Sequence, residues 1–302
     1  MKTAKKMPTY KRQQLVLYFL EAIAAPLDKF DFFKLLMLYI EETQSKHYAF
    51  VPYKYGCYSF LCADDLDLLE KRGWVECQDR HFLLNESSLQ KYRWAQKSEE
   101  RRSVKKWLYR NPVRGDSLIA ETYRRYPYYA VNSTIKNKLL NPNELKAVRA
   151  SVPEIPNNFS LVFTLGYEGI HFEEYINKLI KNRVTVLCDV RKNPFSRKFG
   201  FSGTFLKNKL PDFGIAYLHF PELGIDTEKR QGLKTQADYQ DLFSDYRLEL
   251  PNRKKGLERL KKVIESNRRI ALTCFEAEPH RCHRHCISDF LAREHPYTVQ
   301  HL

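Results

Sequence analysis

The chain has 302 residues with a formal net charge of +15 at pH 7, and hydrophobic residues make up 43% of it. This length is enough for two domains with separate cores, and the composition is that of a soluble globular protein. No apolar run approaches the roughly 20 residues needed to cross a bilayer, and no signal-peptide pattern follows the basic start, so we expect a cytoplasmic protein without a membrane partner.

The charge and the cysteines narrow the expected chemistry. A net charge of +15 predicts a polyanionic partner, and the alternative is a soluble basic protein with no such partner. Aromatic residues lie among the basic ones and suit stacking on bases, so we expect nucleic acid, DNA more than RNA. The seven cysteines are expected to be reduced in the cytoplasm, which favours catalytic or metal-binding roles over disulfides.

Residues 1–86 show the element order of a winged helix, namely three helices followed by a hairpin. Asp28 stands where a helix N-cap is expected, and Gly73 stands where a glycine ends a helix. A mainly α-helical, winged-helix-like domain is therefore predicted. Its predicted elements are helices at residues 14–25, 30–42 and 59–72, and strands at residues 74–77 and 81–84.

This domain resembles the Panacea-type domains of antitoxins and defence-associated proteins. The resemblance rests on Phe32-Phe-Lys-Leu-Leu-Met-Leu-Tyr39, on Tyr53-Lys-Tyr-Gly56 and on the run Leu66–Val75. It implies a role near phage defence or DNA modification. The helix before the wing carries four acidic residues between Asp64 and Glu70, which suit a DNA major groove poorly. We therefore expect a protein partner or a homo-oligomer interface here more than base readout.

Residues 87–158 form a predicted basic and aromatic helical connector. Its cations recur at three- or four-residue spacing, so one helix face can follow a phosphate backbone, and a solvated connecting helix is the alternative. Its last part, residues 141–158, is rich in proline and asparagine and is predicted to be the linker between domains. The predicted nucleic-acid-binding residues are Arg101, Arg102, Lys105, Lys106, Arg124 and Arg125, with Lys91, Arg93, Lys97, Arg110 and Arg114 in the same segment.

Residues 159–302 alternate between strands and helices, and several of the strands are continuous apolar runs. This pattern predicts a Rossmann-like α/β domain with a largely parallel sheet that is covered on both faces. The predicted strands are residues 161–165, 184–190, 216–220, 269–273 and 298–301. The predicted helices are residues 172–181, 204–210, 237–247, 253–266 and 284–293.

Polar motifs follow three of these strands. Tyr167 comes after the first strand, Asp189 and Arg191 end the second, and Cys274 ends the fourth, so we expect them to share the carboxyl edge of the sheet. The loop after Asp189 carries Arg191, Ser196 and Arg197, which suit a phosphate; the alternative is a basic surface loop. Asp189 is expected either to act as acid/base or only to orient Arg191.

The densest cluster of reactive groups lies between Cys274 and Cys286. Cys282 stands at a predicted helix N-terminus among cations, which favours a lowered thiol pKa and a nucleophile with Glu276 or His283 as proton carrier. Cys274 is a second candidate, or a small apolar residue at a strand end. A metal site is the alternative, because Cys282 and Cys286 are four residues apart and Cys274 with His283 or His285 completes four ligands. No Cys-x-x-Cys pair is present, so the sequence assigns no metal.

Four motifs in this half resemble those of the uncharacterised family known as domain of unknown function 488. They are Thr164-Leu-Gly-Tyr-Glu168-Gly169, Asp189-Val-Arg191-x-x-Pro194-x-Ser196-Arg197, His219-Phe-Pro-Glu222-Leu-Gly224, and Cys274-x-Glu276 followed by Pro279 and Cys282-His283-Arg284. The resemblance spans residues 161–302 and implies a family rather than a reaction. It carries over Cys274, Glu276, Cys282, His283 and Arg284 as functional positions, and leaves any cofactor unknown.

Together these features predict an enzyme that acts on DNA, RNA or a nucleotide, in DNA modification, repair or phage defence. Glu276 or Asp189 is expected to serve as acid/base, and Arg191, Arg197 and Arg284 as phosphate clamps around a flipped or terminal base. The alternative is a non-catalytic DNA-binding regulator whose pocket senses a small anion. The pocket arginines are expected to contribute to ligand binding more than to stability.

Overall fold

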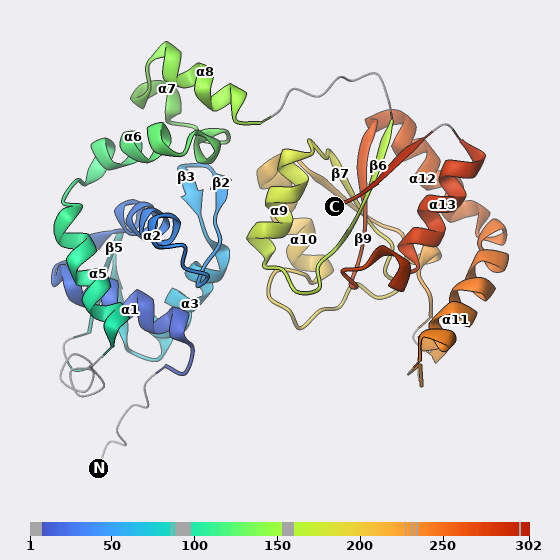
Figure 1. Ribbon diagram of the computed structural model, residues 1–302, viewed down its shortest axis with the longest axis horizontal. Helices are drawn as coiled ribbons and strands as arrows, with labels where there is room; N and C mark the ends of the chain where they lie inside the picture. Colours follow the sequence, from blue (N-terminus) through green and yellow to red (C-terminus); the bar gives the residue numbers. More distant parts are fainter. Residues whose placement is uncertain are drawn as a thin grey trace. The chain divides into compact units, whose positions relative to one another are not determined.

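The chain forms two compact units, Met1–Val152 and Pro153–Leu302 (Figure 1). The structure, a computed structural model, describes residues 8–85, 87, 98–152, 160–226, 228–230, 232–233, 235–295 and 297–302. No helix in these ranges has the length and apolar character needed to cross a membrane.

The first unit is mainly helical and begins with the predicted three helices and hairpin. Helices α1 (Lys11–Ile23), α2 (Lys29–Thr43) and α3 (Phe60–Lys71) are followed by strands β4 (Val75–Gln78) and β5 (His81–Leu84). A short strand β1 (Leu27–Asp28) adds to β5, and β2 (Val51–Tyr53) pairs with β3 (Gly56–Tyr58) as a separate hairpin. The predicted winged-helix-like order is therefore present, with two additional features in β1 and the β2–β3 hairpin.

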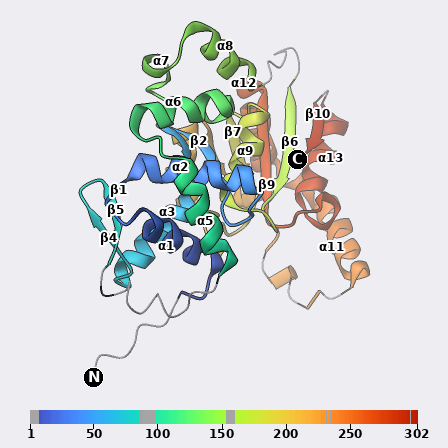
Figure 2. The same cartoon turned by 60° about the vertical axis from the view of Figure 1, so that its left-hand side comes forward.

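Helix α2 is the centre of this unit (Figure 2). Its residues from Asp31 to Ile40 are all buried, as its nearly uniform apolar sequence predicts. The side chain of Asp28 accepts a hydrogen bond from the Phe30 amide at 2.7 Å, which confirms the predicted N-cap. Gly73 follows the end of α3 with a φ of 68°, a conformation that costs glycine little.

Residues 98–152 of the segment predicted as a connector belong to the first unit. Helix α5 (Glu99–Arg110) packs on α1, and α6 (Gly115–Arg125) packs on α2. Two further helices follow, α7 (Lys136–Leu139) and α8 (Pro142–Ala150). The predicted linker over residues 141–158 is thus wrong in its first part, because Asn141 and Glu144 form a capping box that starts α8. Lys91, Arg93 and Lys97 lie outside the described residues.

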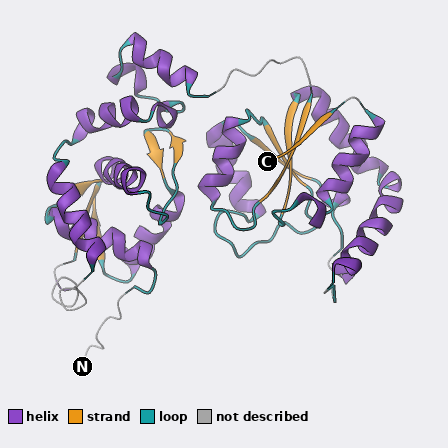
Figure 3. Cartoon of the chain, viewed as in Figure 1, coloured by secondary structure: helices purple, strands orange, loops and turns teal. Residues whose placement is uncertain are grey.

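The second unit is a five-stranded parallel sheet with helices on both faces, which confirms the predicted Rossmann-like α/β fold. Figure 3 shows the strands together in the middle, and Figure 1 shows α9 and α10 on one side with α12 and α13 on the other. Every predicted strand and helix of this unit is present. The elements are β6 (Leu161–Gly166), α9 (Phe172–Lys181), β7 (Val186–Asp189), α10 (Gly203–Lys209), β8 (Ala216–His219), α11 (Gln236–Glu249), α12 (Lys254–Asn267), β9 (Arg269–Cys274), α13 (Arg284–Glu294) and β10 (Thr298–His301).

The strand order is β10-β6-β9-β7-β8, so β9 lies between the first two strands of the unit. The connection from β6 to β7 leaves room for one strand between them, and β9, which comes later in the sequence, occupies that position. Three loops that are far apart in the sequence therefore leave neighbouring strands at the same edge. In open parallel sheets this edge is where ligands bind.

Candidate functional site

The three polar motifs meet at the carboxyl edge of the sheet, as the sequence predicts. In the sheet register Gly166 of β6 stands opposite Cys274 of β9, and Asp189 of β7 stands opposite Thr273. Because β6, β9 and β7 are adjacent, the residues that follow these strands are brought together.

Close backbone contact joins the loop after β6 to the loop after β9. The amides of Tyr167 and Glu168 both donate to the Phe275 carbonyl, at 3.0 and 2.9 Å. A Cβ atom on Gly166 would lie 1.8 Å from the Glu276 carbonyl oxygen, so no other residue fits at this position. The Glu168 carboxylate accepts from the Ala277 amide at 3.0 Å. These contacts hold Glu276 in a defined position at the sheet edge.

Asp189 and Arg191 form a buried ion pair instead of a catalytic or phosphate-binding set. Both guanidinium edges are used: Nε donates to Asp189 Oδ1 at 2.8 Å, and Nη1 donates to Tyr167 Oη at 2.7 Å and to the Phe201 carbonyl at 2.9 Å. Burial alone would lower the pKa of Arg191, but the hydrogen bonds and charge of Asp189 raise it above its ordinary value. The predictions of Arg191 as a clamp and of Asp189 as acid/base are therefore corrected.

Tyr167 belongs to this buried assembly as well. Its ring stacks on Phe201 at 4.3 Å, with an angle of 8° between the planes, and it is 3% exposed. Its hydroxyl accepts from Arg191, so Tyr167 supports the loop rather than facing a ligand. The aromatic stacking and the ion pair together make the second strand end a rigid support for the site.

Arg284 is also structural. It is 1% exposed, and its guanidinium donates to the carbonyls of Glu276 and of Ala277, the second at 2.7 Å. The residue thus fastens the loop that carries Glu276 to the start of α13. The predicted clamp would need Arg284 to face solvent, whereas the side chain is enclosed and its Nη1 and Nη2 face backbone oxygens.

Three residues of the loop after β7 were predicted to bind phosphate, namely Arg191, Ser196 and Arg197, and only Arg197 is exposed. The half-buried Ser196 hydroxyl accepts from the Lys198 amide at 3.2 Å. Lys198 donates to the Tyr167 carbonyl at 2.6 Å, and Lys192 pairs with Asp226 at 2.9 Å. Arg197 is exposed. A phosphate at this loop would therefore meet mainly Arg197.

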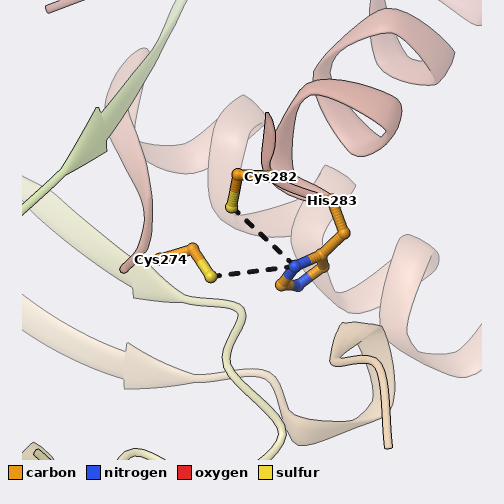
Figure 4. A group of neighbouring side chains, drawn as sticks. All are labelled: Cys274, Cys282 and His283. Atoms are coloured by element: carbon orange, nitrogen blue, oxygen red, sulfur yellow. Dashed lines mark hydrogen bonds between the residues drawn. The ribbon is translucent and has the colours of Figure 1, made fainter. Parts of the chain in front are cut away.

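Cys274, Cys282 and His283 come together below this edge (Figure 4). The Cys274 sulfur lies 3.7 Å and the Cys282 sulfur 3.9 Å from His283 Nδ1, and all three residues are at most 1% exposed. Glu276 Oε2 is 3.4 Å from the Cys274 sulfur, and this carboxylate is half-buried. The sequence-predicted catalytic residues of this motif are therefore neighbours, with Glu276 as the most accessible of them.

Cys286 does not join the other two cysteines. Cys282 has an extended backbone, with φ −139° and ψ 136°, and precedes the helix, so the four-residue spacing does not place the two thiols on one helix face. The Cys286 sulfur instead contacts His285 Nε2 at 3.5 Å. The four-ligand set that the spacing suggested, with Cys286 in it, is thus wrong.

Burial raises the pKa of the Cys282 thiol well above its ordinary value, and the nearby Cys274 and Glu276 raise it further. The prediction of a lowered pKa and a reactive nucleophile is therefore corrected. In the native protein we expect an alkylating reagent to label Cys282 at least about tenfold more slowly than the partly exposed Cys77. Time-resolved mass spectrometry of the labelled peptides measures this, and equal or faster labelling of Cys282 would contradict the buried position.

A cavity of about 840 Å³ lies beside this cluster. It is bordered by helix α11, by the loop after β9 and by His285 of α13. Its polar lining includes Glu168, Glu276, Arg247 and Arg281, and its rings include Tyr239 and Phe275. The contribution of α11 was missed from the sequence, since nothing in its residue spacing indicates which loop it will face.

His285 and Arg247 are connected inside this cavity. His285 Nδ1 donates to the Cys282 carbonyl, and Arg247 donates to His285 Nε2 at 2.7 Å, so the imidazole is neutral with its proton on Nδ1. Burial, with Arg247 as a nearby positive charge, lowers the pKa of His285. The pair therefore presents the single positive charge of Arg247 to the cavity.

The predicted nucleic-acid-binding residues of the first unit separate into two groups. Arg101 pairs with Glu21, Arg124 with Glu144 and Arg125 with Glu42, so these three guanidinium groups are neutralised by the protein. The exposed residues lie on one side of α5, opposite the buried Val104 and Leu108. We call this surface the basic face of α5, and its members are Arg102, Lys105, Lys106, Tyr109 and Arg110.

Residues 171–291 match the model of the family described as Domain of unknown function DUF488. This range contains Asp189 and the whole segment from Cys274 to Arg284, so the predicted resemblance of the C-terminal half is confirmed there. Tyr167 and Glu168 lie outside the matched residues. The chain matches no curated protein and no solved structure. The resemblance of the first unit to Panacea-type domains stays a prediction.

Proposed function

We propose that this protein is an enzyme that acts on a nucleic acid or a nucleotide, with the reacting nucleotide in the cavity of the C-terminal unit. The observation that carries the proposal is the lining of that cavity, which combines the carboxylates of Glu168 and Glu276, two guanidinium groups and the two exposed rings of Tyr239 and Phe275. A nucleotide needs these three kinds of contact: cations for its phosphates, a ring for its base and a group that transfers a proton.

Each lining group has a distinct task in this proposal. Arg247 and Arg281 provide positive charges for phosphate oxygens, and one guanidinium group can bind two such oxygens through parallel hydrogen bonds. Phe275 is 43% and Tyr239 39% exposed, so both rings have a face available for a base. Glu276 is the acid/base, because Asp189, the other candidate, is fully enclosed and bound to Arg191.

The basic face of α5 supplies the contact with a longer polyanion. Its four cations recur along one side of the helix, and none of them forms an ion pair with another described residue. Tyr109, at 88% exposure, stands among them as a ring that can stack on a base. Cations that are not neutralised by the protein release counterions when phosphates replace them.

The second candidate is a non-catalytic regulator whose cavity binds an anionic ligand. It is favoured by the burial of Cys274, Cys282, His283 and Asp189, which leaves fewer accessible proton-transfer groups than the sequence suggests. Turnover distinguishes the two functions, since both predict ligand binding.

Replacing Glu276 with glutamine is expected to reduce turnover by about 10²- to 10⁴-fold without abolishing ligand binding, because it removes proton transfer but keeps the side-chain shape. Mononucleotides and short single-stranded and duplex oligonucleotides are the substrates, and products are identified by mass spectrometry. Binding is followed separately by the rise in Tm.

The matched control is Glu278→Gln, an equal change on an exposed glutamate two residues away. It should leave turnover and binding unchanged. Binding by the wild type without turnover of any of these substrates would favour the regulator. No binding and no turnover would reject the cavity as a nucleotide site.

A further inference from the structure

Three side chains of types that can bind a metal, two cysteines and a histidine, converge on one point inside the second unit. Cys274 Sγ, Cys282 Sγ and His283 Nδ1 all lie within 4.8 Å of one another. Cys274 ends β9, and the other two residues lie just before α13, so two separate elements position the group. Figure 4 shows both sulfurs directed toward the same edge of the imidazole ring.

The hydrogen bonds of His283 select the ring nitrogen that faces the sulfurs. Nε2 lies 2.9 Å from the Val190 carbonyl oxygen, which can only accept, so the ring proton is on Nε2. Nδ1 therefore directs its lone pair toward the two thiols. Metal-bound histidines commonly donate their other N–H to a backbone carbonyl in this way, which fixes the ring orientation. The Tyr246 ring meets the imidazole edge-on at 5.6 Å and adds to this constraint.

The two sulfur-to-nitrogen distances are close to those of a tetrahedral zinc site. With Zn–S near 2.3 Å and Zn–N near 2.05 Å, a tetrahedral angle places the sulfur and nitrogen about 3.6 Å apart. The observed sulfur-to-Nδ1 distances are 3.7 and 3.9 Å. Each sulfur-to-nitrogen distance is therefore within a few tenths of an ångström of the value for zinc, and the two sulfurs lie within 4.8 Å of each other. Two thiolates and one imidazole are ligands that zinc accepts readily, and a coordinating thiol loses its proton to the metal.

The fourth position is left open by the described residues. No other histidine, cysteine, aspartate or glutamate among them has a ligand atom within 4.8 Å of all three of these atoms. Glu276 comes near, with Oε2 at 3.4 Å from the Cys274 sulfur, but it is not close to all three ligand atoms, and it borders the cavity. Three protein ligands with an open fourth position are the arrangement of catalytic zinc sites, whereas structural sites have four.

We propose that Cys274, Cys282 and His283 bind a zinc ion through Sγ, Sγ and Nδ1, with a fourth position that is open beside Glu276. The site goes beyond the proposed function and does not depend on it, because metal binding is measured without any substrate. The site also gives the thiols of Cys274 and Cys282 a shared function, metal binding, in addition to their place in the apolar core.

The test is the metal content of the full-length protein, purified without chelators and without a histidine tag. Elemental mass spectrometry is expected to find about one zinc ion per chain, either in the protein as purified or after reconstitution with zinc in the presence of a reductant. Replacement of zinc by Co²⁺ should give the intense visible bands of a tetrahedral site together with thiolate charge-transfer bands in the near ultraviolet. Removal of the metal by a chelator should lower Tm, and added zinc should restore it.

Cys274→Ser and Cys282→Ser are each expected to reduce bound zinc at least about tenfold. Cys286→Ser is the matched control, since Cys286 is equally buried and close by but contacts His285 instead, and it should retain zinc. If the two serine variants do not fold, the chelator and cobalt measurements on the wild type decide alone. No bound zinc in the reduced wild type, before or after reconstitution, would overturn the site.

Glu276→Gln tests the open fourth position separately. Because Glu276 is not a ligand in this proposal, the variant should bind zinc within about twofold of the wild type. Loss of zinc comparable to that of Cys282→Ser would show a four-ligand site that includes Glu276 and would overturn the open position. This result is independent of turnover, so failure of the zinc site and failure of the proposed function are distinguishable.

Discussion

Replacing Asp189 with alanine is expected to lower the free energy of unfolding of the C-terminal unit by about 3–5 kcal/mol. Arg191 is 6% exposed and Asp189 is fully buried, and the guanidinium bonds to the carboxylate through both Nε and Nη2. Without Asp189 the positive charge of Arg191 would remain in the interior with no counter-charge. Equilibrium urea unfolding followed by circular dichroism measures the change.

The matched test is the double change Asp189→Leu with Arg191→Met, which removes both charges together. It should recover most of the lost stability, because the cost of the single change comes from the unpaired charge rather than from the missing bond. Tyr217→Phe removes one hydrogen bond to Asp189, of 2.8 Å, and should cost only about 1 kcal/mol. A loss below about 1 kcal/mol in Asp189→Ala would contradict the buried pair as a main support of this unit.

Reversing the charges on the basic face of α5 is expected to reduce affinity for nucleic acid by at least about 10³-fold at low salt. The variant carries glutamate at Arg102, Lys105, Lys106 and Arg110, while Arg101 is kept because it pairs with Glu21. The plot of log affinity against log salt should lose roughly 3 to 4 units of slope, since four phosphate contacts are removed. Fluorescence anisotropy with labelled single-stranded and duplex DNA at several salt concentrations gives both quantities.

The control for α5 makes the same change of net charge elsewhere. Glutamate at the exposed Lys207, Lys254, Lys255 and Lys262 of the C-terminal unit should reduce affinity less than about fivefold. An equal loss in both variants would mean that net charge alone drives binding. Unchanged binding in the α5 variant would reject the basic face as the contact surface.

The sequence predicted the elements of both units well because their signals are local. Apolar runs and helical periodicity depend on neighbours within a few residues, so every predicted strand and helix of the α/β unit is present. The carboxyl-edge location of the motifs also followed from the sequence, since parallel strands end at one edge. The predicted linker was wrong from Asn141 onward, because the capping box that starts α8 is made of the same polar residue types that are common in loops.

The role of each charged residue depended on tertiary partners. Arg191 and Arg284 resemble phosphate clamps in the sequence, but Tyr167, Phe201 and the Glu276 carbonyl use their donors. Arg101, Arg124 and Arg125 appear equivalent to Arg102 along the chain, yet each meets a glutamate from a distant segment. Periodicity shows which residues share a face, but it does not show what packs against that face.

Patterns along the chain were sufficient to predict the α/β fold, the carboxyl edge of its sheet as the candidate site, and Cys274, Glu276, Cys282 and His283 as residues of that edge. Which of the cysteines are neighbours depends on how distant segments pack. The extended backbone at Cys282 turns its thiol toward the end of β9, whereas Cys286 lies within α13 beside His285. Metal ligands must lie within a few ångströms of one another. Here those distances arise because the end of a strand packs against the start of a helix, and the spacing of residues along the chain does not specify this packing.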